Sequence, residues 1–163
     1  MTGDRAERPD LKAVRLSTTA TPDQVFAVLS NGWLFPSWVV GASRMRAVDD
    51  DWPTVGSRLH HSFGVWPAVI DDATLVLTNE APHRLVLQAA GWPIGEATVN
   101  LRVDPWGAGS MLTITEDATK GPGRLVPAPL RQAAIAVRNR ETLRRLVFLS
   151  EGDAGRVPKD TKN

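Results

Sequence analysis

The sequence predicts an α+β domain in which seven antiparallel strands form one sheet and a long helix follows at the C-terminus. Between residues 42 and 118, apolar and polar side chains alternate with a period of two, which is typical of half-buried strands. Turn residues interrupt this pattern at intervals too short for crossover helices, so neighbouring strands are expected to run antiparallel. Near residues 130–150 the apolar period becomes that of a helix. At 163 residues the chain is long enough for one domain with its own core.

The first strand and two short helices are predicted by local signals near the N-terminus. Residues 11–18 alternate weakly and favour a strand. Thr21 is a good N-cap and Gln24 stands three residues later, so the pair predicts a capping box at the start of a helix. The segment 33–40 is apolar on nearly all sides and contains Pro36, which favours a second segment that is short and helical or irregular.

Six further strands and the final helix complete the predicted order of elements. Clusters of Gly, Pro, Asn and Asp separate the strands, and a Gly- and Pro-rich loop at 120–129 precedes the helix. Arg131, Arg138 and Arg145 recur every seven residues on this helix, and we expect them on its solvent side. The strands are expected near residues 43–49, 57–65, 74–79, 84–90, 96–104 and 110–117.

The composition excludes several classes of function. Apolar residues make up 42% of the chain and charged residues 23%, which is ordinary for a globular protein. A formal net charge of +1 argues against a nucleic-acid binder that neutralises phosphates. The absence of cysteine excludes disulfides, thiolate metal sites and a cysteine nucleophile, and it fits a reducing compartment.

The ends of the chain predict a cytoplasmic protein without membrane insertion. The N-terminal residues lack the apolar segment of a signal peptide, and no apolar run approaches the ~18 residues that a membrane helix needs. Residues 1–10 and 152–163 are polar and aperiodic, so we expect disordered tails around a single domain at 11–151. The charge pattern identifies no partner subunit and leaves a homodimer open.

Three short segments can be compared with known families: Ser17 to Phe26, where a strand runs into a capped helix, Gly56 to Leu59, and His83 to Leu87. Together with the order of the elements and the long final helix, they resemble the SRPBCC (START/Bet v 1-like) superfamily, in particular its bacterial polyketide cyclase/dehydrase-like branch. The resemblance implies a helix-grip fold, in which a curved seven-stranded sheet wraps round the C-terminal helix. It also implies a cavity between the two, for which we expect a few hundred cubic ångströms.

The resemblance implies that this cavity binds a small, mainly apolar molecule of polyketide, aromatic or fatty-acyl type. An alternative is a cyclase or dehydratase that uses a cavity carboxylate and needs no metal or nucleotide cofactor. A second alternative is a protein-interaction module whose cavity is vestigial. The sequence contains no P-loop and no H-E-x-x-H motif, so no cofactor is expected.

Strand alternation identifies Glu116 and His61 as the candidate catalytic residues. Glu116 shares a face with Leu112 and Ile114, and the sequence places no basic residue beside it, so we expect burial to raise its pKa and make it a proton donor. His60 must point away from His61, so the two cannot chelate one metal ion and no metal site is expected. The structural alternatives are a solvated strand end for Glu116 and a hydrogen-bonded core position for His61.

Eight further side chains are expected to line the cavity or its mouth. Alternation directs several strand residues inward, and Asn139 on the inner face of the last helix favours a hydrated or ligand-filled space. Tryptophans supply the large flat walls that such a cavity needs, and the family layout places two of them at the mouth. The set is Trp33, Trp38, Phe63, Trp66, Leu87, Trp92, Val99 and Asn139.

Overall fold

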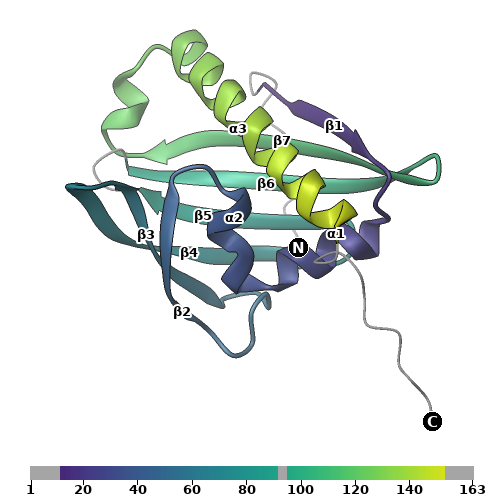
Figure 1. Ribbon diagram of the computed structural model, residues 1–163. Coiled ribbons are helices and arrows are strands. Elements are labelled where there is room, and N and C mark those ends of the chain that lie inside the picture. The colour runs from purple at the N-terminus through teal and green to yellow at the C-terminus, as the bar shows by residue number, and fades with distance from the viewer. Residues whose placement is uncertain (1–11, 92–94, 153–163) are drawn as a thin grey trace, which may run out of the picture.

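The strands and helices follow one another in the predicted order, as the computed structural model describes for residues 12–91 and 95–152 (Figure 1). The strands are β1 (Val14–Thr18), β2 (Ala42–Val48), β3 (Arg58–Val65), β4 (Ala68–Glu80), β5 (Arg84–Gly91), β6 (Gly95–Trp106) and β7 (Gly109–Lys120). The α-helices are α1 (Pro22–Ser30), α2 (Phe35–Trp38) and α3 (Ala128–Glu151), and the short 3₁₀ helices are η1 (Gly32–Leu34) and η2 (Pro122–Leu125).

All seven strands belong to one antiparallel sheet, in the order β1-β7-β6-β5-β4-β3-β2. From β2 onward each strand pairs with the next one along the chain, and β1 pairs with β7 at the far edge. The sheet curves round α3, which runs across it, while α1 and α2 lie on the same side as α3 (Figure 1). This is the helix-grip architecture, so the fold class predicted from the sequence is confirmed.

Helix α1 begins with the predicted capping box. Thr21 Oγ1 accepts a hydrogen bond from the Gln24 backbone N–H at 3.3 Å, and Gln24 Oε1 accepts one from the Thr21 N–H at 2.8 Å. Val25, Val28 and Leu29 on the inner side of α1 are fully buried and belong to the core. The local cap therefore fixes where the helix starts, and the apolar face fixes how it packs.

Strand β4 begins at Ala68, well before the predicted start near residue 74. Asp71 and Asp72 are poor strand formers, which is why the sequence favours a turn at this point. In the structure β3 and β4 form a hairpin that extends to the pair Val65 and Ala68, with Asp72 opposite His61. Pairing along the whole hairpin outweighs the local preference and brings Asp72 into the sheet.

Helix α3 is held to the sheet by apolar and polar side chains together. Leu143 and Leu146 are fully buried in the core, as the helical period predicts. Nearer the start of the helix Gln132 is also buried, and its side-chain amide donates to the Glu116 carbonyl oxygen at 3.2 Å. The N-terminal half of α3 therefore depends on polar contacts with β7.

The prediction that three arginines lie on the solvent side of α3 is wrong for two of them. Arg131 pairs with Asp117 on β7, with 3.3 Å between Nη2 and Oδ1, and Arg138 pairs with Glu116. Arg145 is the one that remains on the exposed side. A seven-residue spacing drifts by about 20° per repeat round a straight helix, and the long side chains reach the acidic residues of β7.

Three predictions concern residues outside the described ranges: the tail at 1–10, the tail at 152–163 except Gly152, and Trp92. Within the described ranges, no helix has the length and apolar character needed to cross a membrane.

Candidate functional site

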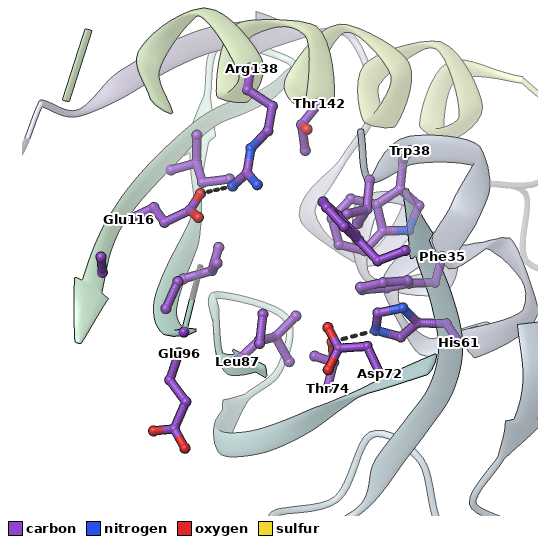
Figure 2. A pocket seen from close by; sticks show the side chains of 18 residues that line it. Phe35, Trp38, His61, Asp72, Thr74, Leu87, Glu96, Glu116, Arg138 and Thr142 are labelled. Atoms are coloured by element: carbon purple, nitrogen blue, oxygen red, sulfur yellow. Dashed lines mark hydrogen bonds and ion pairs between the residues drawn. The ribbon is translucent and has the colours of Figure 1, made fainter. Parts of the chain in front are cut away.

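A cavity lies between the inner face of the sheet, α2 and the middle of α3 (Figure 2). Its volume is about 130 Å³, close to the roughly 150 Å³ of an engineered apolar cavity that binds benzene. Most of its lining is apolar: Phe35, Trp38, Val39, Phe63, Leu87, Ala89, Ala97, Val99, Ile114 and Ala118. The cavity is smaller than expected because Phe35, Trp38 and Arg138 project into the space between sheet and helices (Figure 2).

One polar cluster of the cavity is centred on Glu116 and Arg138. Alternation along β7 directs Glu116 inward after Leu112 and Ile114, as predicted, and its side chain is only 5% exposed. Arg138 Nη2 from α3 forms an ion pair with Glu116 Oε2 (Figure 2). The expectation that Glu116 has no basic neighbour is therefore wrong, because the fold brings together residues that the sequence separates.

Thr142 lies one helical turn after Arg138 and also lines the cavity. Its Oγ1 accepts a hydrogen bond from the Val40 backbone N–H at 3.4 Å, which connects α3 to the segment after α2. Arg138, Glu116 and Thr142 thus form one polar wall, called the α3/β7 cluster below.

A second polar cluster is centred on His61 of β3. The side chain is 2% exposed, and its Nε2 lies 2.9 Å from Thr74 Oγ1 of β4. The Phe35 ring covers the imidazole, with 5.0 Å between ring centroids and 37° between planes. Burial lowers the pKa of His61, because an imidazolium would lose its hydration in this apolar setting. His61 is therefore a neutral imidazole near pH 7.

Asp72 is a cavity residue that the sequence interpretation missed. It lines the cavity beside Thr74 and stands opposite His61 in the β3–β4 register. Burial raises the pKa of its carboxyl group, although the Ala73 N–H donates to Oδ1 at 2.7 Å. Alternation among Asp72, Thr74 and Val76 would have identified it, had the strand been predicted to start early enough.

Four of the eight predicted ligand-binding residues line the cavity: Trp38, Phe63, Leu87 and Val99. Asn139 is buried, with 1% of its surface exposed, but lies outside the lining. Trp33 and Trp66 are 60% and 85% exposed and are not part of the wall. Trp33 follows the cap of η1 and Trp66 occupies the turn between β3 and β4, so both side chains point to solvent.

Glu96 contributes to the lining, but its carboxylate is directed away from the centre (Figure 2). Lys120 Nζ lies 3.0 Å from Glu96 Oε2, and this hydrogen-bonded cation lowers the pKa of Glu96. The described residues contain no group of three or more His, Asp or Glu side chains placed to hold a metal ion.

A seven-stranded sheet that grips a long C-terminal helix, with a cavity between them, defines a Bet v 1/START-like protein. Within this class the chain belongs to the family described as polyketide cyclase / dehydrase and lipid transport, whose model matches residues 11–151. The predicted SRPBCC membership is thereby confirmed.

Solved structures support the same fold. Protein NE0264 from Nitrosomonas europaea aligns with a TM-score of 0.68 at 17% identity, over 89% of this chain and 97% of that one. Ara h 8.0201 aligns with a TM-score of 0.66 at 10% identity, over 86% and 96%. The di-domain ARO/CYC StfQ from the steffimycin biosynthetic pathway aligns with a TM-score of 0.68 at 14% identity, over 91% of this chain and 54% of that one. A comparison with curated proteins gave no match.

Proposed function

We propose that this protein binds a small, mainly apolar ring compound in the cavity between the sheet and α3. The observation that supports this most directly is a mainly apolar space of about 130 Å³ whose polar side chains form two clusters, apart from Glu96, whose carboxylate is directed away from the centre (Figure 2). Such a cavity favours a ligand with a mainly apolar body and a few polar groups, which the two clusters can orient by hydrogen bonds. The family description, which includes lipid transport and polyketide chemistry, is in keeping with an apolar ligand.

The size and walls of the cavity favour an aromatic or polyketide-type ring over a long acyl chain. The volume suits a single six-membered ring with small substituents. Phe35 and Trp38 supply rigid walls, with ring centroids 5.3 Å apart and planes at 75°. Flat aromatic walls make close contact with a flat ring at little cost in side-chain entropy.

Arg138 is the residue that we expect to orient the ligand. Its pair with Glu116 uses Nη2, and a guanidinium carries five N–H donors in all. A ligand carbonyl, enolate or carboxylate beside α3 would accept from this group. The pair with Glu116 holds the guanidinium in place before the ligand arrives, which reduces the ordering cost of binding.

The test uses toluene as the probe and cavity filling as the perturbation. Ala97 lines the cavity and Ala133 is exposed on α3, so Ala97→Leu and Ala133→Leu add the same atoms inside and outside the site. We expect toluene titrations followed by NMR to shift the Trp38 indole signal in the wild type and in Ala133→Leu. Ala97→Leu should weaken binding at least tenfold. Equal affinities in all three proteins would exclude this cavity as the binding site.

A second candidate function is an acid–base enzyme that closes rings by aldol condensation. It is favoured by a neutral His61, which can accept a proton, in the same cavity as Arg138, which can polarise a carbonyl. Heptane-2,6-dione is a probe of suitable size. After a proton is removed from C1 of this dione, C1 attacks the C6 carbonyl carbon and forms the C–C bond that closes a six-membered ring. Loss of one water molecule then gives 3-methylcyclohex-2-enone. Turnover that His61→Gln abolishes while toluene affinity is retained would support the enzyme; no turnover by the wild type would reject it.

A further inference from the structure

We propose that Asp72, His61 and Thr74 form a second subsite, which binds a ring hydroxyl of the ligand. This inference rests on the proposed function and specifies its ligand class: a hydroxylated ring, of phenol or enol type. The three residues are called the β3/β4 subsite below.

The β3–β4 hairpin places these three side chains together. His61 and Asp72 are directly opposite each other in the antiparallel register, and Thr74 follows Asp72 on the same face. All three line the cavity. Figure 2 shows them grouped on the wall across from Glu116 and Arg138, with Leu87 between the two groups. The subsite is therefore distinct from the α3/β7 cluster.

Charge distinguishes the two clusters. Glu116 is neutralised by Arg138, whereas no ion pair within residues 12–91 and 95–152 reaches the carboxylate of Asp72. The nearby Arg46 pairs instead with Asp71, 3.4 Å from Nε to Oδ1, and donates to the Asp72 backbone carbonyl at 3.1 Å. Asp71 and Asp72 are consecutive in a strand, so their side chains point to opposite faces. Among the described residues, the half-buried carboxylate of Asp72 therefore has no ion-pair partner, and Arg46 acts on it only from a longer distance.

Such a carboxylate favours a ligand that brings a hydrogen-bond donor. The Ala73 N–H is the one hydrogen-bond donor to the Asp72 carboxylate in the part of the chain that the structure describes. Burying an ionised group that keeps so few partners is costly, and burial raises the pKa of Asp72. A donor from the ligand would replace hydration that the carboxylate loses on burial, and hydrogen bonds to charged groups are among the stronger ones.

His61 and Thr74 favour a hydroxyl over an ammonium group as this donor. They share one hydrogen bond, with 2.9 Å between Nε2 and Oγ1. If His61 Nε2–H donates to Thr74 Oγ1, the Thr74 hydroxyl proton is free to donate into the cavity. If the Thr74 hydroxyl donates to His61 Nε2 instead, the Thr74 oxygen keeps a lone pair that can accept a hydrogen bond. A ligand hydroxyl has a single proton, so it can donate to Asp72 while its oxygen accepts from the Thr74 hydroxyl, which is free to donate when His61 donates to Thr74. An ammonium group can only donate and would leave that Thr74 proton without an acceptor.

The sheet also sets the spacing between the two clusters. β4 and β7 are separated by β5 and β6, which is three steps of about 4.8 Å along the sheet, or roughly 14 Å before the side chains reach inward. Leu87 and Val99 on the intervening strands form an apolar floor. The two clusters therefore stand on well-separated strands, and we place the ligand hydroxyl at the β3/β4 end.

The experiment compares 4-methylphenol with toluene and 4-methylanisole by NMR titration. The wild type should bind 4-methylphenol about tenfold more tightly than 4-methylanisole, which fits the same apolar walls but cannot donate. Asp72→Asn should lower the 4-methylphenol affinity about tenfold and change toluene affinity less than twofold. Asp71→Asn, the matched control on the outer face, should change neither. Thr74→Val, which keeps the side-chain shape, should also reduce the preference for 4-methylphenol.

The outcomes separate this inference from the proposed function. Toluene binding with no effect of Asp72→Asn or Thr74→Val on 4-methylphenol would overturn the hydroxyl subsite and leave the apolar binding site standing. Tighter binding of 4-methylbenzylamine than of 4-methylphenol would overturn the hydroxyl class in favour of a cation. Failure of every probe to bind the wild type would overturn the proposed function and this inference together.

Discussion

Arg138 of α3 and Glu116 of β7 form an ion pair across the cavity wall, although 22 residues separate them in the chain. The two side chains differ in burial: Glu116 is 5% exposed and Arg138 is 35% exposed. The carboxylate therefore depends on the guanidinium for its stabilisation, while the guanidinium also reaches solvent. Together with the Arg131–Asp117 pair, this contact holds the N-terminal half of α3 against the sheet.

The first prediction concerns the stability contributed by this pair. Arg138→Met leaves a buried carboxylate without a cation, a change that costs about 3–5 kcal/mol for fully buried pairs and less here because the guanidinium is partly solvated. Glu116→Gln should cost less, since Arg138 can turn to water. Arg145→Met is the matched control, because its pair with Glu141 is exposed and should contribute about 0.3–0.5 kcal/mol. Urea unfolding measures all three; equal losses for Arg138→Met and Arg145→Met would contradict the prediction.

The second prediction concerns the pH dependence of stability. Burial lowers the pKa of His61 below its usual value of about 6.5, so the unfolded chain binds this proton more readily than the folded protein. The free energy of unfolding should therefore fall as pH drops below about 6.5, with a slope of at most about 1.4 kcal/mol per pH unit for one proton. His61→Gln should remove this contribution.

His60→Gln is the control for the pH experiment, because His60 neighbours His61 but lies beside Asp49, 3.4 Å away, on the other face. The acid-side decline should persist in this variant. Thermal melts at a series of pH values between 7.5 and 5.5 would compare the proteins. A decline that is unchanged in His61→Gln would show that another group causes it.

The third prediction is that Asp72→Asn stabilises the free protein at pH 7. Burial raises the pKa of Asp72, so ionisation is disfavoured in the folded state and its cost appears as pH rises through the folded pKa. The gain from Asp72→Asn should disappear below about pH 4, where the carboxyl is protonated in both states. Asp71→Asn should give no such gain, since it removes the pair with Arg46. Destabilisation by Asp72→Asn at pH 7 would mean that the carboxylate is already satisfied without a ligand.

The fourth prediction uses two glycines with positive φ to probe a cavity wall. At Gly41, φ is +100° and an added Cβ would lie 2.4 Å from the ring of Phe63, which lines the cavity. At Gly56, φ is +93° and no atom lies within 4 Å of such a Cβ. Gly56→Ala should cost about 1–2 kcal/mol from backbone strain alone. Gly41→Ala should lower the free energy of unfolding by more than Gly56→Ala does, because the Phe63 ring must also move. The same movement should weaken toluene binding.

Comparison of the two variants by urea unfolding and toluene titration separates backbone strain from displacement of the wall. Equal stability loss with unchanged toluene affinity in both would indicate that Phe63 yields without altering the cavity.

Local signals were sufficient to predict most of the fold. The capping box of Thr21 and Gln24 involves residues three apart, and strand parity directs His61 and Glu116 inward wherever their strands pair. These inferences succeed because hydrogen bonds within a turn and the alternation of side chains depend only on near neighbours along the chain.

The electrostatics of the cavity were decided by the tertiary structure alone. Asp72 enters the sheet because β3 pairs with it over the whole hairpin, against the local preference of aspartate. Arg138 becomes the partner of Glu116 only once α3 is laid across β7. The periodicity of a strand predicts which face of the sheet a side chain occupies. It does not predict the contact partner, because that partner comes from a distant segment of the chain. Strand parity was therefore enough to place His61 and Glu116 on the inner face, whereas the pairing of Glu116 with Arg138 and the presence of Asp72 in the cavity depend on contacts between distant segments.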